Sequence, residues 1–178
     1  MTVSKALVRA SNRMSFWSRA AVVAVPASTV ALFVFPDHMR MLGNVFVGTH
    51  YGQHLYGSVP LADRLEALIF AMIPTAIATW GLVALARLFR QFAAGEVFSD
   101  ASLQSLGTIA AALFWNVIAA MVTEPAITYF LSRSHDVYAQ LTLGPDDAEF
   151  LFLAGIAFVI ARVMAEARNV AEENAKFV

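Results

Sequence analysis

Four apolar stretches, each long enough to cross a lipid bilayer, dominate this 178-residue chain. They cover about residues 16–35, 65–88, 103–130 and 148–165. A hydrocarbon core of about 30 Å requires about 20 helical residues, and inside lipid only helices and closed barrels satisfy every backbone polar group. A transmembrane barrel would alternate apolar and polar residues in short segments, and these stretches do not. The sequence therefore predicts an all-α polytopic membrane protein, a bundle of four transmembrane helices.

Composition supports this class and argues against several functions. Charged residues make up 14% of the chain, against roughly 25% in soluble domains. We expect residues 1–178 to form a single integral membrane domain, because four helices and their connections leave no room for a soluble catalytic module. The net charge of -1 at pH 7 argues against a nucleic-acid-binding surface. The chain has no cysteine, which removes disulfides, thiolate nucleophiles and cysteine metal ligands.

Basic residues predict how the chain is threaded through the membrane. Nine of them fall on one predicted side: Lys5, Arg9, Arg13, Arg19, Arg87, Arg90, Arg162, Arg168 and Lys176. The other side has three, Arg40, Arg64 and Arg133. Both termini are therefore expected in the cytoplasm, with an external loop at 36–62, a cytoplasmic loop at 89–102 and a cytoplasmic helix extension at 166–176. The first apolar run is too long for a typical signal peptide, so we expect it to stay as an uncleaved helix.

Local motifs predict where the second and fourth transmembrane helices begin. Asp63 and Glu66 have the spacing of a capping box, which predicts that the second helix starts there. Pro145 is followed by three carboxylates within one turn, where the helix dipole favours negative charge, and this pattern predicts the start of the fourth helix. Along that helix, a stripe of small residues is expected to pack closely against a neighbour: Ala154, Ala157, Ala161 and Ala165.

The connection between the second and third helices is expected to be a tight hairpin. Gly95 would end one helix in a left-handed conformation, Ser99 would cap the next, and Phe98 would pack back as a staple. This loop motif is interpreted as structural, and the alternative is a cytoplasmic docking site formed together with the extension of the fourth helix.

Polar residues inside lipid are the default functional candidates. Asn116 lies near the middle of the third apolar stretch and shares a face with small residues, which predicts packing with an amide hydrogen bond to another helix. Glu124 precedes a proline near the predicted outer boundary. It is interpreted either as an interfacial carboxylate paired with Arg64 or Arg133, or as a proton or cation site.

Two prolines, Pro26 and Pro74, fall near the bilayer centre and predict kinks at one level in the first two helices. Ser28 and Thr75 are expected to help satisfy the carbonyls that the prolines leave free. Matched kinks of this kind occur in the discontinuous helices of transporters. A small transporter or channel component that uses these kinks and Glu124 is therefore the alternative function.

The four histidines, His38, His50, His54 and His135, all fall on the predicted external side. None lies in an apolar stretch, which argues against a haem held between helices. His50 and His54 are four residues apart, a spacing at which a helix lets two imidazoles share a metal ion, but Gly48 and Gly52 disfavour that helix. No catalytic residue, cofactor or metal is therefore predicted, and these two histidines are the only metal candidates. The surrounding loop is interpreted as an interfacial segment or, alternatively, as a lid or docking surface.

Two segments carry more specific patterns. Residues 88–99 read LFRQFAAGEVFS, with a helix end, a glycine, a phenylalanine and a serine cap, and residues 169–174 read NVAEEN beyond the fourth helix. Together they resemble a bacterial membrane-protein family of unknown function, DUF2975, over the second to fourth helices. The family usually has leucine where this chain has Val170, and its common ending differs from the AKFV of residues 175–178. The resemblance implies a four-helix protein of the bacterial inner membrane and supplies no activity.

A chain with so few buried chemical groups is expected to act through contacts rather than catalysis. The leading hypothesis is a non-enzymatic accessory or interaction subunit of the inner membrane. Its expected partners are the lipid bilayer and either another membrane protein or further copies of the same chain, and no nucleic acid is expected.

Overall fold

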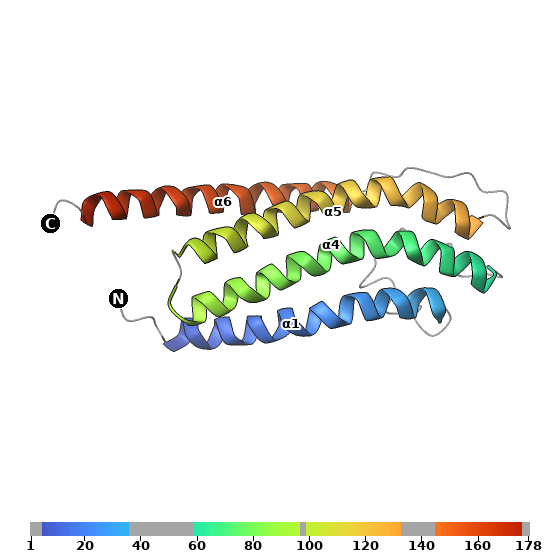
Figure 1. The fold of residues 1–178 in the computed structure, drawn as a ribbon, viewed down its shortest axis with the longest axis horizontal. Coiled ribbons are helices and arrows are strands. Elements are labelled where there is room, and N and C mark those ends of the chain that lie inside the picture. Colours follow the sequence, from blue (N-terminus) through green and yellow to red (C-terminus); the bar gives the residue numbers. More distant parts are fainter. Residues whose placement is uncertain (1–4, 36–58, 97–98, 133–144, 176–178) are drawn as a thin grey trace.

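The computed structural model describes residues 5–35, 59–96, 99–132 and 145–175 (Figure 1). These ranges contain four α-helices: α1 (Lys5–Val34), α4 (Leu61–Ala93), α5 (Asp100–Ser132) and α6 (Pro145–Ala175). Strands are absent from the same ranges, so the predicted all-α class is confirmed. Several predicted features lie outside the described residues: most of the loop at 36–62, Arg40, Arg133, Phe98, and the four histidines His38, His50, His54 and His135.

Each of the four helices is long and apolar enough to cross a membrane. The candidate spans are Val8–Val34, Leu61–Ala93, Asp100–Leu131 and Ala148–Ala167. The helices are longer than the apolar stretches that predict them, because polar and charged residues continue each helix beyond its apolar part. α1 begins at Lys5 rather than near residue 16, and α6 continues to Ala175, through most of the predicted extension.

The helices pack in a row that follows their order in the chain (Figure 1). The main contacts join α1 to α4, α4 to α5, and α5 to α6. Neighbouring helices run antiparallel, so the start of α1 and the end of α6 lie at the same end of the molecule, which we call the terminal end. In this open arrangement α1 and α6 each have one main neighbour, whereas α4 and α5 each have two.

The main hydrophobic core lies at the opposite end. It is formed by the end of α1, the start of α4 and the end of α5, and contains Leu32, Phe33, Val59, Ala67, Ala71, Ile127 and Leu131. Beside it, the rings of Phe70 and Phe130 stack with their centroids 5.6 Å apart. This core ties three of the four helices together at one end of the row.

Small polar residues fill the contact between α1 and α4 toward the terminal end. Ser11, Ser15 and Ser18 are buried on one face of α1. The hydroxyl of Ser15 donates a hydrogen bond to the backbone carbonyl of Ala86 on α4, with a distance of 3.3 Å. Small hydroxyl side chains let two helices approach closely and bond across the contact, as is common between membrane helices.

The helices α4 and α5 approach each other closely at Gly81. A Cβ atom added to this glycine would lie 2.9 Å from the Cβ atom of Ala112, which is closer than two carbon atoms pack. Since the neighbouring atom belongs to an alanine, it cannot rotate away. Gly81 is therefore the residue that permits this helix contact.

The two predicted helix starts have different outcomes. α4 begins at Leu61, with Pro60 as its N-cap residue and no side-chain cap, so the predicted capping box of Asp63 and Glu66 is wrong. Asp63 is instead the third residue of the helix. The helix dipole stabilises its negative charge there, but its side chain does not cap the helix. α6 begins at Pro145, as predicted.

Candidate functional site

The prolines of α1 and α4 lie at a shared level of the molecule, and both helices continue through them. The hydroxyls of Thr29 and Thr75 are 3.3 Å apart and join the two helices close to Pro26 and Pro74. Both threonines are buried. Figure 1 shows that α4 changes direction along its length, whereas α6, which has no internal proline, runs nearly straight.

The hydroxyls near these prolines do not bond the carbonyls that the prolines leave free. A proline removes the hydrogen bond to the carbonyl four residues earlier, which belongs to Val22 for Pro26 and to Phe70 for Pro74. Ser28 bonds the carbonyl of Val25 and Thr75 that of Ala71, each at 2.8 Å. The prediction for Ser28 and Thr75 is therefore wrong. The physical reason is distance along the helix. A helical hydroxyl bonds a carbonyl three or four residues earlier, whereas Val22 lies six residues before Ser28 and Phe70 lies five residues before Thr75.

Asn116 joins α5 to the same level. Its side-chain nitrogen donates a hydrogen bond to the backbone carbonyl of Pro74, with a distance of 2.8 Å. This contact agrees with the interpretation of Asn116 as a packing residue whose amide bonds across helices. The polar groups Thr29, Thr75 and Asn116 thus link α1, α4 and α5, as polar residues between membrane helices commonly do.

Glu124 is buried in α5, directly before Pro125. One of its proposed partners, Arg64, lies within hydrogen-bonding distance of two backbone carbonyls at the end of α1, those of Phe33 at 3.4 Å and Val34 at 3.5 Å. A cation at this position complements the helix dipole of α1 and its unsatisfied carbonyls. The proposed pairing of Glu124 and its alternative role as a proton or cation site stay predictions.

The hairpin between α4 and α5 has the predicted caps at both helix ends. Gly95 has a φ of 85°, the left-handed conformation expected of it. The amide of Glu96 donates to the carbonyl of Gln91 and that of Gly95 to Phe92, which is the hydrogen-bond pattern of a Schellman motif. On the other side, the hydroxyl of Ser99 accepts a hydrogen bond from the amide of Ser102 at 3.2 Å and so caps α5.

Changing Gly95 to alanine is expected to lower the free energy of unfolding by about 1 kcal/mol, because a Cβ atom disfavours the left-handed conformation. Thermal unfolding of the purified protein in detergent measures this loss. Gly107→Ala in α5 is the matched control, since a Cβ atom there meets nothing within 4 Å. An equal or larger loss of stability in the control would contradict the assigned role of Gly95.

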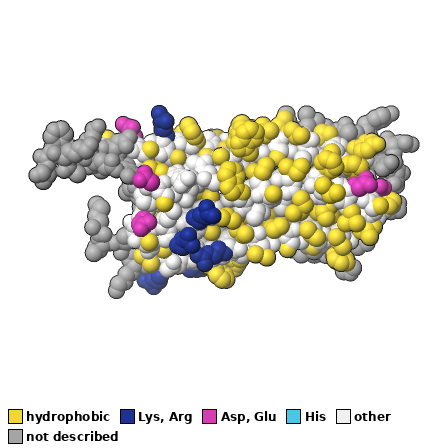
Figure 2. Space-filling view, in the orientation of Figure 1, with side chains coloured by type: hydrophobic (Ala, Val, Ile, Leu, Met, Phe, Trp, Pro, Cys, Tyr) yellow, Lys and Arg dark blue, Asp and Glu magenta, His cyan; other side chains and the backbone are white. Residues whose placement is uncertain are grey.

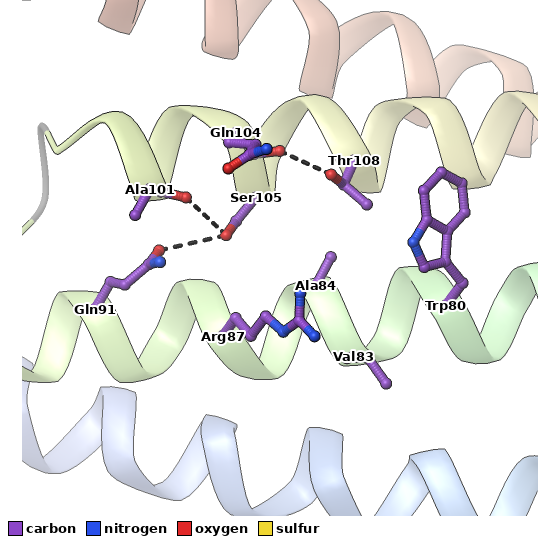
Figure 3. A pocket seen from close by; sticks show the side chains of 9 residues that line it. All are labelled: Trp80, Val83, Ala84, Arg87, Gln91, Ala101, Gln104, Ser105 and Thr108. Atoms are coloured by element: carbon purple, nitrogen blue, oxygen red, sulfur yellow. Dashed lines mark hydrogen bonds between the residues drawn. The ribbon is translucent and has the colours of Figure 1, made fainter.

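A cleft of about 400 Å³ lies between α4 and α5, toward the terminal end (Figure 3). One face of each helix lines it. α4 contributes Trp80, Val83, Ala84, Arg87 and Gln91, and α5 contributes Ala101, Gln104, Ser105 and Thr108. In Figure 3, Arg87 extends along α4 beside Ala84, Gln91 lies at one end and Trp80 at the other.

The cleft is polar and carries a positive charge. None of its nine lining residues is acidic, and the guanidinium group of Arg87 forms no hydrogen bond or ion pair with another described residue. The side-chain oxygen of Gln91 lies 3.2 Å from the hydroxyl of Ser102 and 3.4 Å from that of Ser105. These contacts hold the Gln91 oxygen and leave its amide nitrogen as a donor for the cleft.

Sequence reasoning missed this cleft. It used Arg87 only for membrane orientation and did not weigh Gln91 and Gln104 at all. The available pattern was a group of amide and hydroxyl side chains near one arginine on two helices joined by a short hairpin. Which faces of α4 and α5 meet, however, depends on the orientation of each helix about its own axis, which the sequence does not display.

A metal centre finds no support in the part of the chain that the structure describes. Within that part, no three histidine, cysteine, aspartate or glutamate residues lie close enough to share an ion. The metal candidates His50 and His54 lie outside it.

The chain matches a known protein family over most of its length. A family model described as "Protein of unknown function (DUF2975)" matches residues 20–178. The match includes α4, α5, α6 and the second half of α1. Searches of curated proteins and of solved structures found no match.

Proposed function

Because the chain belongs to DUF2975, a family of unknown function, we propose its role from its geometry: a non-enzymatic accessory or interaction subunit of a bacterial inner membrane. The cleft between α4 and α5 supports the non-enzymatic part of the proposal. Its hydroxyls neighbour amides and backbone carbonyls, and none of its lining residues is a histidine or carboxylate that would activate a nucleophile.

The observation that carries the interaction role is the exposure of α6. Among the side chains of α6 that the structure describes, only Ala154 is buried. The predicted stripe continues from it with Ala157, Ala161 and Ala165, which are half-buried. α6 therefore uses its small-residue face for its one main neighbour, α5.

The opposite side of α6 presents a row of apolar side chains, Phe152, Ile156, Val159 and Val163, which we call the packing face. All four side chains are exposed, and their spacing of four, three and four residues is typical of the seam between two helices that cross at a small angle. We propose that a helix of another membrane protein or of a second copy packs on this face.

The proposed orientation has both termini in the cytoplasm. The described part of the terminal end carries Arg9, Arg13, Arg87 and Arg90, Arg19 and Arg162 lie near the middle of α1 and α6, and Arg64 lies at the opposite end. Figure 2 shows the basic side chains gathered toward the terminal end, next to a broad hydrophobic surface. An excess of arginine is typical of the cytoplasmic side of a membrane protein.

Site-specific crosslinking in native membranes tests the packing face. Because the chain has no cysteine, Val159→Cys labelled with a benzophenone maleimide places one photoreactive group on that face. It is expected to crosslink to one defined protein or to a second copy. Phe158→Cys is the matched control, since Phe158 is equally exposed but lies about 100° around the helix. Failure of both variants to crosslink, together with a monomeric size in mild detergent, would overturn the proposal.

A further inference from the structure

The cleft between α4 and α5 crosses the depth at which a membrane changes from hydrocarbon to headgroups. Residues 67–86 of α4 form a run of 20 residues without a charge, between Glu66 and Arg87. At about 1.5 Å per residue this run is about 30 Å long, the thickness of a hydrocarbon core. Arg87 therefore lies at headgroup level, and Trp80, two helical turns earlier, lies about 10 Å deeper.

The cleft is thus amphiphilic along the direction in which a lipid lies. Arg87, Gln91 and Gln104 supply N–H donors toward the terminal end, and Trp80 and Val83 supply apolar surface toward the hydrocarbon. Donors with a positive charge and without a carboxylate favour an anion over a cation. Trp80 is 49% exposed, so it is available to a ligand at this depth.

We propose that this cleft binds one anionic phospholipid of the adjoining leaflet. Arg87 pairs with the headgroup phosphate, the amides of Gln91 and Gln104 donate to its remaining oxygens, and Trp80 packs against the upper part of an acyl chain. Basic pockets between transmembrane helices bind anionic headgroups in this way. The inference is independent of the proposed interaction role, because it depends on α4 and α5 and not on α6.

The volume and position of the cleft fit this ligand better than a free anion. About 400 Å³ is at the small end of the range for ligand sites, which suits a headgroup and glycerol whose chains extend outside. A free phosphate has no apolar group that would contact the end of the cleft formed by Trp80. A soluble anion would also have to leave water for a site beside hydrocarbon, whereas a lipid phosphate already lies at that depth.

Fluorescence quenching by brominated lipids tests the proposal on the full chain. Trp17→Phe and Trp115→Phe together leave Trp80 as the only tryptophan. The protein is reconstituted in phosphatidylcholine vesicles that contain increasing fractions of brominated phosphatidylglycerol or brominated phosphatidylcholine. Both phosphates can form a charge-assisted hydrogen bond with Arg87, but phosphatidylcholine also carries a quaternary ammonium, whose positive charge Arg87 repels. We therefore expect the anionic lipid to quench Trp80 at a roughly tenfold lower fraction.

Two variants distinguish the cleft from general attraction to the basic end. Arg87→Gln is expected to remove the preference for the anionic lipid. Arg90→Gln, an equally charged change at an exposed residue that does not line the cleft, is expected to keep it. Gln104→Leu removes one donor without changing the charge and is expected to reduce the preference.

Three results would overturn the proposal. Equal quenching by the two lipids would show that the cleft does not select a lipid of net negative charge. An equal loss in Arg87→Gln and Arg90→Gln would assign the preference to surface charge. Displacement of the brominated lipid by millimolar glycerol phosphate would assign the cleft to a soluble anion instead.

Discussion

Replacing Gly81 by valine is expected to force α4 and α5 apart and to lower the free energy of unfolding by about 1–3 kcal/mol, the usual range for overpacking. The added Cβ atom would lie 2.9 Å from the Cβ of Ala112, and valine carries two further methyl groups on that atom. At this contact neither helix has a flexible side chain that can move aside. The structure allows relief only by moving the helices themselves.

Thermal unfolding in one detergent, followed by tryptophan fluorescence, measures the effect. Gly107→Val adds the same side chain to α5 at a position where a Cβ atom meets nothing within 4 Å, so its melting temperature is expected to stay close to that of the parent protein. If both variants melt at the same temperature, the close approach of α4 and α5 at Gly81 is not a stabilising contact.

Labelling of single cysteines at the two ends of α4 is expected to give an all-or-none result. Ala62 and Ala94 are exposed and lie at opposite ends of this helix. With both termini in the cytoplasm, Ala62→Cys should react with an impermeant maleimide in intact spheroplasts, whereas Ala94→Cys should react only after lysis. The parent chain has no cysteine and is the blank.

The reverse labelling pattern would invert the membrane orientation and assign the cleft with Arg87 to the outer leaflet. Reaction of both variants before lysis would show that α4 does not cross the membrane. Either result would also move the histidines, because their predicted external location follows from the same distribution of basic residues.

The helices and several of their ends follow from short-range chemistry, which a sequence displays directly. Twenty apolar residues in a row predict a transmembrane helix because lipid satisfies no backbone hydrogen bond. The caps at Gly95 and Ser99 and the start of α6 at Pro145 depend on residues within one helical turn, so the sequence predicted them correctly. The predicted start of α4 was wrong because two local patterns competed. The spacing of Asp63 and Glu66 suits a capping box, but Pro60 has a backbone conformation that suits an N-cap, and the helix begins before Asp63.

The prediction for Ser28 and Thr75 failed because of a spacing that the sequence itself shows. A hydroxyl bonds a carbonyl three or four residues earlier, and the position four residues after each free carbonyl is the proline itself. Only a hydroxyl at position 25 or 73 could therefore reach the carbonyls that Pro26 and Pro74 leave free. For Asn116, by contrast, the sequence indicated an interhelical bond but not its acceptor. The acceptor, the carbonyl of Pro74, is 42 positions away in the chain.

Hydrophobicity and local spacing were enough to predict four membrane-spanning helices and the hairpin caps between α4 and α5. The row of helices, the contact of Gly81 with Ala112 and the cleft around Arg87 emerge only when the helices are packed. The physical reason is that lipid tails are as apolar as leucine, so burial of apolar surface does not choose which helix faces meet. That choice depends on the shapes of small residues and on a few interhelical hydrogen bonds, and these exist only in three dimensions.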